Sequence, residues 1–351
     1  MLTLDLSDVR LEYLAEGAAN IVYRILPPDT DPSTAADLQF ESDDYDSDTP
    51  LPTEIPPSQL DPHLNGKLVR LRKYLPSATP MEESHRHFET MIQPLFQSEN
   101  LIGSELFRIS RYLLKDCNAS LRKMEKNGKR PSKRHGVYLV ENEKHGCLIM
   151  DMSSKFGEAS TCLEFKPKWL VQSPSAPNGS RRCRTCALRA MKRENKADPP
   201  EKSKAGFCPL NLVSYDKTKI GIFLDHIIGP SPDRKALNLR GRLIDFLHKN
   251  PLLDKIRSLQ LELDPEGVFK ADLLSPKFLA AMTLRDCTLF LKVPTNGKGA
   301  IEARLGDLDL KTSSGRKSEY WRSLERQLID EGWYTATERD KAAHENLCQL
   351  S

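Results

Sequence analysis

The feature that most restricts the fold is the stretch from Pro27 to Asn65, which contains ten acidic residues, eight prolines and neither Lys nor Arg. Such a segment cannot bury enough apolar surface to offset the conformational entropy lost on ordering. We therefore expect a mobile acidic insertion over residues 27–65, which in the simplest interpretation is a solvated loop without a function of its own. The folded body must be built from what precedes and follows it.

The insertion conceals the charge of that body. The whole chain carries 52 Lys and Arg against 49 Asp and Glu, a net charge of +3. Without the ten acids, 52 basic residues stand against 39 acidic ones, a net charge of +13. A basic body indicates an anionic partner, which is a nucleic acid, an anionic membrane or a highly phosphorylated small molecule.

The sequence shows no sign of export or membrane insertion. No apolar run reaches the roughly 18 residues of a membrane span, and the N-terminus is acidic where a secretory signal is basic and then apolar. Eight cysteines are scattered along a long chain, which favours reduced thiols. We expect a soluble protein of the nucleus or cytoplasm.

Hydrophobic patterning predicts a mixed α+β protein. In the first part, β-branched and alternating segments predict strands at 9–14, 21–26 and 67–74, helices at 82–92 and 113–126, and a hairpin of 136–140 with 146–150. The second part is more helical, with helices predicted at 187–193, 234–248, 252–261, 275–281 and 318–329 and strands at 163–165, 287–293 and 301–305.

The first motif with candidate chemistry is the loop Glu16-Gly17-Ala18-Ala19-Asn20, between two predicted strands. Small residues let backbone amides approach phosphate oxygens, as in the loop that covers a nucleotide in kinases. A plain hairpin turn is the alternative.

Lys166 and Lys168 flank a proline in the second motif, Glu164–Trp169. The proline keeps the segment extended, so a period of two puts both lysines on one side. Two converging ammonium groups suit a multiply phosphorylated ligand, whereas a solvated basic edge is the alternative.

Cys183 and Cys186 form a Cys-x-x-Cys pair inside a basic stretch, 181–204, that holds nine basic and three acidic residues. Such a pair is half of a zinc site, with Cys208 a possible third ligand and His226 a distant fourth. Because a second close pair is missing, a basic turn that contains two thiols is the favoured interpretation.

Carboxylates lie next to two further predicted strands. Asp286 precedes one, and Asp307, Asp309 and Lys311 close the other, where a period of two would put all three on one side. Carboxylates at the ends of adjacent strands can supply a general base and a metal ligand to one substrate. Surface ion pairs are the alternative for each carboxylate taken singly.

Taken in order, these motifs resemble those of the inositol-pentakisphosphate 2-kinase family, in a fungal-type member. The matching segments span nearly the whole chain and are EGAANIVYR (16–24), VRLRK (69–73), LEFKPKW (163–169), CRTC (183–186), TLRDCTLF (283–290) and DLDLK (307–311). The resemblance implies a two-lobed inositol polyphosphate kinase fold, distantly protein-kinase-like, with an N-lobe at 1–151 and a C-lobe at 152–351. It also implies ATP- and Mg²⁺-dependent phosphorylation of the 2-hydroxyl of inositol 1,3,4,5,6-pentakisphosphate, giving inositol hexakisphosphate (phytate).

The resemblance assigns roles to individual residues. Asp286 matches the general base, and Asp307, with Asp309 close behind, matches the Mg²⁺ ligand. The residues that would bind ATP are Gly17, Ala18, Ala19 and Asn20 over the phosphates, Arg72 (or Arg70) in place of the protein-kinase lysine, and Asp151 and Met152 at the adenine hinge. The residues that would bind substrate phosphates are Lys166, Lys168, Lys311, Arg316 and Tyr320.

The chain departs from the family in two places. Family members often have a histidine-rich run after Cys-x-x-Cys, where this chain has ALRAMK (187–192). Arg189, Lys192 or Arg193 would then take over that phosphate contact. Plant members carry a structural zinc ahead of the RDC motif, but residues 209–285 contain no Cys here, so no zinc is expected in that segment.

Two non-enzymatic functions are the alternatives. One is a nucleic-acid-binding protein that uses the stretch 181–204, although that stretch lacks aromatic stacking residues and no nucleic-acid motif is recognised. The other is an inactive relative that only binds inositol polyphosphates, against which the retained Asp286, Asp307 and Lys311 argue. We therefore expect a monomeric enzyme whose partner is inositol pentakisphosphate, with no nucleic-acid or membrane partner.

Overall fold

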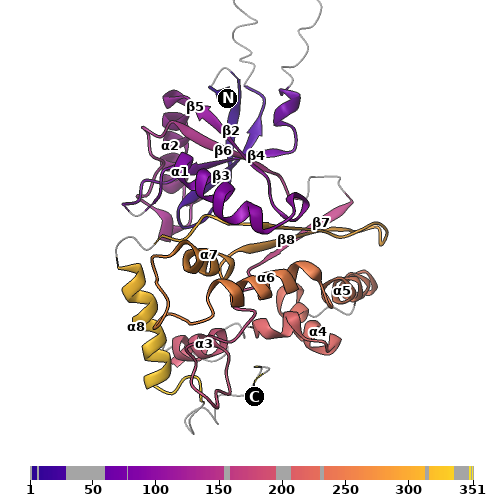
Figure 1. The fold of residues 1–351 in the computed structure, drawn as a ribbon. Helices are drawn as coiled ribbons and strands as arrows, with labels where there is room; N and C mark the ends of the chain where they lie inside the picture. Colours follow the sequence, from indigo (N-terminus) through magenta and orange to yellow (C-terminus); the bar gives the residue numbers. More distant parts are fainter. Residues whose placement is uncertain are drawn as a thin grey trace, which may run out of the picture. The chain divides into compact units, whose positions relative to one another are not determined.

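The structure is a computed structural model that describes residues 2–5, 8–28, 60–76, 78–153, 159–194, 207–229, 233–312, 316–335, 348 and 350. The chain divides into two units, each with its own core (Figure 1). The first comprises Met1–His85 and Gly103–Asp151, and the second comprises Arg86–Ile102 and Met152–Ser351. Residues 86–102, which the sequence division assigns to the first lobe, thus belong to the second unit.

The first unit is built on a six-stranded sheet in the order β1-β5-β6-β4-β3-β2. Its strands are β1 (Thr3–Leu4), β2 (Arg10–Glu16), β3 (Asn20–Leu26), β4 (Lys67–Arg72), β5 (Ser104–Ile109) and β6 (His145–Met150). β1 runs parallel to β5, and the other neighbouring pairs are antiparallel. The fold class α+β is confirmed by this sheet and the helices around it.

Along β3, buried residues alternate with more exposed ones, so that one face of the strand lies in the core. Ile21, Tyr23 and Ile25 are buried on one face, and they share a core with apolar residues of α2 (Arg111–Lys126). Ser110 caps that helix, since its hydroxyl accepts from the Leu113 amide. Such a cap satisfies one of the amide groups that the first helical turn leaves without a partner.

Two expectations for the first unit need correction, and one strand of its sheet was not predicted. The predicted hairpin of 136–140 and 146–150 is wrong, because β6 pairs with β4 and β5, and Leu139 makes only an isolated bridge to Lys73. β5 was not predicted. The end of the acidic insertion is ordered, with Leu64 in a short 3-10 turn, Pro62–Leu64, and buried in the core. Residues 29–59 of the insertion lie outside the described residues.

The second unit contains a three-stranded antiparallel sheet in the order β7-β8-β9. The strands are β7 (Ser160–Phe165), β8 (Thr288–Pro294) and β9 (Glu302–Gly306). The central strand β8 carries Leu289, Leu291 and Val293, all of them buried in the core of this unit. The core also takes in Phe88, Ile92 and Leu101 from the segment 86–102.

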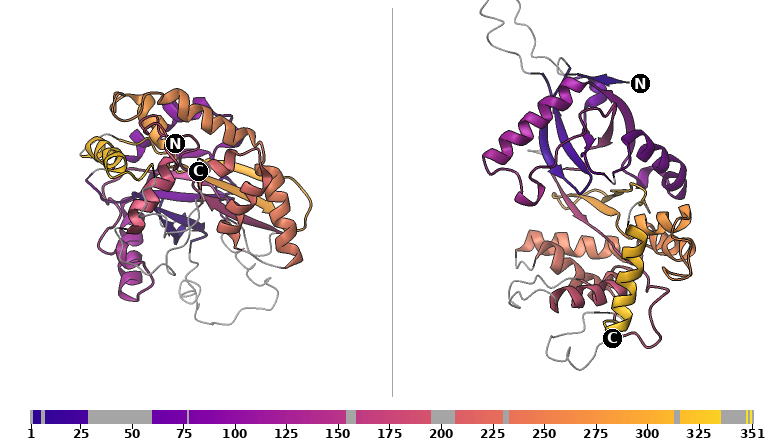
Figure 2. Two further views of the ribbon diagram at one scale, coloured as in Figure 1. Left: turned by 90° about the horizontal axis from the view of Figure 1, so that it is seen from below. Right: turned by 90° about the vertical axis from the view of Figure 1, so that its left-hand side faces the viewer.

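Helices make up most of the rest of the second unit. They are α3 (Arg184–Glu194), α4 (Lys217–Ile228), α5 (Arg234–Leu247), α6 (Pro251–Leu263), α7 (Pro276–Leu284) and α8 (Lys317–Asp330), after α1 (Met81–His87), which begins in the first unit. α4 packs against α5, α6 against α7 and α3 against α8 (Figures 1 and 2). Single-turn segments are η2 (Phe88–Ile92), η3 (Gln93–Leu95), η4 (Ser98–Asn100), η5 (Ser132–Arg134) and η7 (Pro209–Val213).

Side-chain caps set the helix starts in the second unit. Ser275 caps α7 with Pro276 in its first turn, as predicted, and Asn250 caps α6 in the same way. α4 was missed, although Asp216 caps it and Gly229 follows it with a φ of 75°. That φ lies in the left-handed region, which favours glycine after a helix.

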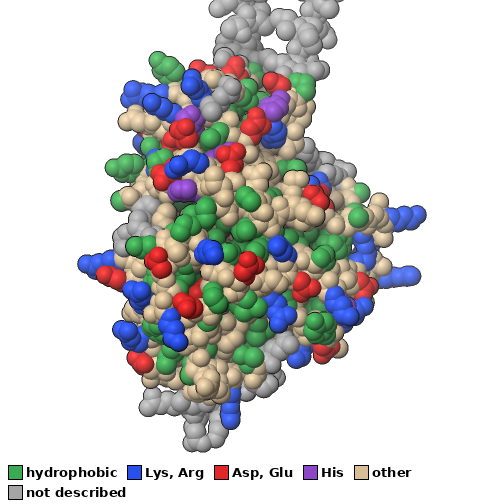
Figure 3. Space-filling model, in the orientation of Figure 1, with side chains coloured by type: hydrophobic (Ala, Val, Ile, Leu, Met, Phe, Trp, Pro, Cys, Tyr) green, Lys and Arg blue, Asp and Glu red, His purple; other side chains and the backbone are tan. Residues whose placement is uncertain are grey.

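Surface charge in the described residues is mixed. On the face drawn in Figure 3, Lys and Arg side chains are interspersed with Asp and Glu side chains. Within the described parts of the chain, no helix is both long and apolar enough to cross a bilayer.

Candidate functional site

The topology of the three-stranded sheet brings three distant segments together. Because β7 and β8 are antiparallel, the end of β7 at Phe165 pairs with the start of β8 at Leu289. The start of β8 also pairs with the end of β9, Thr288 with Gly306. The residues just beyond these ends, 166–168, 286 and 307, therefore meet at one end of the sheet.

Three lysines and two aspartates converge there. This lysine–aspartate cluster consists of Lys166, Lys168, Asp286, Asp307 and Lys311. Lys166 Nζ donates to Asp307 Oδ2 (2.6 Å) and lies 3.3 Å from Asp286 Oδ1. Asp286 also accepts from Lys168 Nζ at Oδ1 (3.0 Å) and from Lys311 Nζ at Oδ2 (2.7 Å).

The lysines control the ionisation of Asp286. Burial alone would raise its pKa, but the hydrogen bond and charge of Lys311, with the charge of Lys168, hold the pKa of Asp286 well below its ordinary value. For Lys166, burial acts to lower the pKa, and the contact with Asp307 outweighs it and raises the pKa. By residue type, the cluster carries three formal positive charges against two formal negative ones.

The backbone of the cluster adopts an uncommon conformation. Lys168 has a φ of 62° and Asp307 a φ of 56°, in the left-handed region that residues other than glycine rarely occupy. Such residues cost about 1–3 kcal/mol each and persist where the surroundings fix them. Asp307 thus lies beyond the end of β9, so the predicted strand alternation of Asp307, Asp309 and Lys311 is wrong.

Two buried side chains fix the strained segments. Gln260 donates through Nε2 to the Lys168 carbonyl (2.9 Å) and accepts from the Leu170 amide (2.9 Å), so it holds both sides of Trp169. Thr283 Oγ1 accepts from the Lys311 amide (2.9 Å). Neither residue is singled out by a sequence motif for binding, because their contact is with the backbone.

A buried ion pair lies next to Asp286. Arg285 Nη1 donates to Asp264 Oδ2 (2.6 Å), with both side chains at most 1% exposed. The Arg285 guanidinium also stacks 3.7 Å from the centroid of the Trp169 ring, and Arg184 lies over the same ring at 4.4 Å. The Trp169 ring therefore contacts two cations, and the contact with Arg285 connects the residues after β7 with those before β8.

Arg184 extends this framework toward α8. Its Nε donates to Glu325 Oε2 (2.7 Å), and Glu325 Oε1 accepts from Ser173 Oγ and Tyr334 Oη, each at 2.6 Å. Glu325 is completely buried. Because a buried charge is tolerated only when it is paired and hydrogen-bonded, these contacts specify one arrangement of the residues around the cluster.

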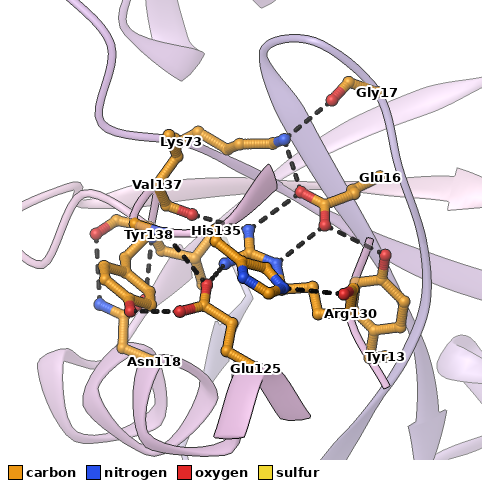
Figure 4. A network of polar contacts seen from close by, with 12 residues as sticks. Tyr13, Glu16, Gly17, Lys73, Asn118, Glu125, Arg130, His135, Val137 and Tyr138 are labelled. Atoms are coloured by element: carbon orange, nitrogen blue, oxygen red, sulfur yellow. Dashed lines mark hydrogen bonds and ion pairs between the residues drawn. The ribbon is translucent and has the colours of Figure 1, made fainter. Parts of the chain in front are cut away.

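In the first unit, the Glu16–Asn20 loop is held by a buried lysine (Figure 4). Gly17 donates its amide to the Asn20 carbonyl (3.0 Å), which closes the turn between β2 and β3. Lys73 Nζ donates to Glu16 Oε2 (2.6 Å) and to the Gly17 carbonyl (2.8 Å), and the Lys73 amide donates to Ala19. Gly17 and Ala18 are exposed above these contacts.

Arg130 completes the support of that loop. It donates to both carboxylate oxygens of Glu16 (2.9 and 3.0 Å), to the Val137 carbonyl (2.6 Å) and to Glu125. Burial acts to raise the pKa of Glu16, yet the hydrogen bonds from Arg130 and Lys73 lower it to about 2. Glu16, Lys73 and Arg130 are at most 2% exposed, so the network is part of the core of this unit.

The predicted nucleotide-binding arginine makes contacts within the first unit. Arg72 donates to Glu143 (2.7 Å) and to the Ala78 carbonyl (3.1 Å). The cation that contacts the loop is Lys73, to which the sequence motifs assign no role. Val69 and Leu71 are in the core, and Lys73 follows them on their face.

Two other residues predicted to bind nucleotide are Asp151 and Met152, where the chain passes from the first unit to the second. Asp151 is half-buried and donates its amide to the Gly66 carbonyl (2.8 Å), and Met152 is 4% exposed. The first unit ends with Asp151, and the chain enters the second at Met152.

The remaining predicted substrate-binding residues lie on two helices of the second unit. On α3, Arg189 donates to the Phe207 carbonyl and Lys192 is exposed. Arg316 precedes α8 and is exposed, and Tyr320 in that helix is 57% exposed.

Lys317 is a candidate that the sequence motifs did not indicate. Burial, together with the charge of Lys311, lowers the pKa of Lys317. It donates to Thr312 Oγ1 at 3.3 Å. Its place between two predicted phosphate-binding residues, Arg316 and Tyr320, was the available signal.

Asp307 and Asp309 are the candidate magnesium ligands. The Asp307 side chain is 51% exposed, and Asp309 is half-buried, with its carbonyl 3.5 Å from Thr283 Oγ1. Mg²⁺ prefers oxygen ligands and binds through one or two carboxylates together with substrate phosphates. The residues present fit such an ion.

Comparison with known proteins gives two matches. The family model for inositol-pentakisphosphate 2-kinase matches residues 13–327. A curated relative from Yarrowia lipolytica (strain CLIB 122 / E 150), an inositol-pentakisphosphate 2-kinase, is 37% identical over 178 residues. That alignment covers 50% of this chain and 54% of the relative, so the match spans about half of the relative's length.

Proposed function

The chain belongs to the inositol-pentakisphosphate 2-kinase family, and from that premise we propose that it transfers the γ-phosphate of ATP to the 2-hydroxyl of inositol 1,3,4,5,6-pentakisphosphate. The product is inositol hexakisphosphate. The observation that carries this proposal is the convergence of Lys166, Lys168 and Lys311 on two carboxylates at one end of a sheet.

The cluster suits a polyanionic substrate because it holds one more positive charge than negative charge. Near 4 Å, each pair of opposite unit charges is worth about 4 kcal/mol at an effective dielectric constant of 20. Five phosphates would draw the ammonium groups of Lys166, Lys168 and Lys311 away from the carboxylates. The lysine–aspartate contacts thus hold the three lysines in position before substrate binds. On binding, the substrate phosphates would replace the carboxylates as partners of the lysines.

That exchange would also change the basicity of Asp286. With its lysines engaged, the carboxylate has a strongly lowered pKa and is a poor base. Once phosphates take up the lysines, the pKa of Asp286 rises toward its ordinary value, and the carboxylate can accept the proton of the 2-hydroxyl. Substrate binding would therefore activate its own general base.

Asp307, with Asp309, would hold the Mg²⁺ that accompanies ATP. When bound, the ion supplies neutralisation of the charge that develops on the transferred group. Lys166 contacts both Asp286 and Asp307, so it ties the positions of the base and the metal ligand to each other.

In the first unit, the exposed Gly17–Asn20 loop is the candidate for the ATP phosphates, as expected of a distantly protein-kinase-like N-lobe. Lys73 and Arg130 hold this loop from the core side through Glu16. We assign Lys73, in place of Arg72, to the support of that loop. The second unit, which comprises residues 86–102 and 152–351, would bind the inositol phosphate.

The deciding experiment incubates the purified chain with Mg-ATP and inositol pentakisphosphate and separates the products by anion-exchange chromatography. We expect inositol hexakisphosphate from the wild type and almost none from Asp286→Asn. The matched control, Asp245→Asn, removes an exposed carboxylate of the same unit that pairs with a surface lysine, and it should retain activity. Substrate binding without product formation by the wild type would instead favour a non-catalytic inositol phosphate binder.

A further inference from the structure

Four cysteines gather in the second unit, apart from the lysine–aspartate cluster. The thiol cluster consists of Cys183, Cys186, Cys208 and Cys348, whose Sγ atoms all lie within 4.8 Å of one another. Cys183 and Cys208 are completely buried, and Cys186 and Cys348 are at most 9% exposed. Three segments far apart in sequence supply these thiols.

The distances between the sulfurs fit one tetrahedral ion. A Zn–S bond of about 2.3 Å gives a sulfur–sulfur edge of roughly 3.8 Å in a tetrahedron. Cys183 Sγ lies 3.8 Å from Cys208 Sγ, and Cys208 Sγ lies 3.9 Å from Cys348 Sγ. A disulfide would need about 2.05 Å, and none of the eight cysteines, all of which lie in the described residues, forms one.

We propose that the thiol cluster binds a single Zn²⁺ through four cysteine thiolates as a structural site. Four protein ligands leave no open position for substrate or water, as in closed structural zinc sites. The sulfurs are too close together for an iron–sulfur cluster, which places several atoms between its cysteines. For a lone divalent ion, zinc binds such a site more tightly than iron does.

A helix N-terminus and a backbone amide lie at the thiol cluster. Cys183 immediately precedes α3, and Cys186 lies in its first turn, so both are at the positive end of the helix dipole. The Cys183 amide donates to Cys348 Sγ (3.1 Å). Hydrogen bonds from backbone amides to ligand sulfurs are the kind of outer contact that orients metal ligands.

In the ligand set considered from the sequence, Cys348 takes the place of His226. Cys183, Cys186 and Cys208 were identified as possible ligands, but the fourth thiol comes from near the C-terminus, 165 residues after Cys183. His226 is not in the cluster and packs edge-on against Phe207. Close pairs in sequence could not reveal a ligand contributed by so distant a segment.

The ion would fasten the C-terminal segment to the start of α3. That helix carries Arg184, which stacks on Trp169 next to Lys168 and pairs with Glu325. It also carries Arg189, whose acceptor is the carbonyl of Phe207, the residue before Cys208. Zinc would therefore stabilise the second unit on the side of the framework that includes α3.

The test measures metal in the full-length chain, purified under reducing conditions without a chelator, by inductively coupled plasma mass spectrometry. We expect one zinc per chain in the wild type and in Cys162→Ser, which removes a half-buried thiol of β7 outside the cluster. In Cys208→Ser we expect the zinc content to fall by at least roughly 10–100-fold. Disturbing even the outer contacts of a metal ligand lowers metal affinity by that range, and this variant removes a ligand itself.

A second measurement on folded wild-type protein covers the case in which Cys208→Ser does not fold. X-ray absorption at the zinc edge should show four sulfur neighbours at about 2.3 Å. Wild-type protein without zinc, iron in its place, or nitrogen or oxygen neighbours would overturn the proposal, as would equal zinc loss in Cys162→Ser. Because the readout is metal content and coordination, the outcome is independent of whether the chain phosphorylates inositol pentakisphosphate.

Discussion

Removing Asp264 tests whether the buried framework behind the cluster is held by charge pairing. Asp264→Ala leaves the Arg285 guanidinium buried without its carboxylate, because both side chains are at most 1% exposed and lie 2.6 Å apart. Breaking a buried pair by removing one partner costs about 3–5 kcal/mol. Arg285 keeps the Trp169 ring and the Gln260 carbonyl at 3.3 Å, so we expect the lower end, about 3 kcal/mol.

Tryptophan fluorescence during urea unfolding provides the assay. All three tryptophans, Trp169, Trp321 and Trp333, belong to the second unit, so their emission reports on it alone. Asp245→Ala breaks an exposed pair with Lys217 and should cost at most about 1 kcal/mol.

The double variant Asp264→Leu/Arg285→Met removes both charges and should recover most of the lost stability. The reasoning fails if Asp264→Ala is no more destabilising than Asp245→Ala, or if the double variant is less stable than Asp264→Ala.

Three further outcomes are expected. Asp286→Asn should lower kcat by about 10²–10⁴, the range for lost general-base catalysis, with inositol pentakisphosphate binding retained in calorimetry; an unchanged kcat would remove Asp286 from that role. Lys168→Ala should raise KM for the inositol phosphate and leave KM for ATP unchanged, so equal increases in both would contradict its assignment. The pKa of Glu16, lowered from 4.5 to about 2, contributes stability that is present above pH 4.5 and lost as the pH falls toward 2. Scanning calorimetry should show the wild-type Tm falling over this range and Glu16→Gln falling less; equal slopes would refute the linkage.

The sequence predicted the elements that carry strong local signals. Helix α7 has a Ser-Pro start and an apolar face, and β3 and β8 are rich in β-branched and other apolar residues. β5 and α4 were missed although each has its signal, a short alternation in β5 and an Asp cap with a following glycine in α4. The hairpin error arose because β6 pairs with strands distant in sequence, and hydrophobic patterning does not specify such partners.

The candidate site, like the fold, could be predicted from the sequence only in part. The motifs identified the five members of the lysine–aspartate cluster by residue type, and the sheet topology explains why they meet. Lys73 received no role from the sequence, because residue type alone does not show which of two neighbouring cations, Arg72 or Lys73, lies on the core face of the strand. Gln260 and Cys348 act through tertiary contacts with segments far away in sequence, so no local pattern marks them.

The segment 86–102 determines how this protein can be divided. Ile102 donates its amide to the Leu305 carbonyl (2.8 Å), and Arg304 donates to the Leu101 carbonyl (3.0 Å), so the outer edge of β9 is paired with residues that precede it by some two hundred positions. Phe88, Ile92 and Leu101 add three buried side chains, worth about 1.5–3 kcal/mol each. A fragment that begins at Met152 would lose these hydrogen bonds and buried side chains. Their combined contribution to the free energy of unfolding is comparable to the whole stability of many domains. Expression of the C-terminal half alone should therefore give aggregating material, whereas a version with residues 86–102 fused ahead of it through a flexible linker has the complete set of parts.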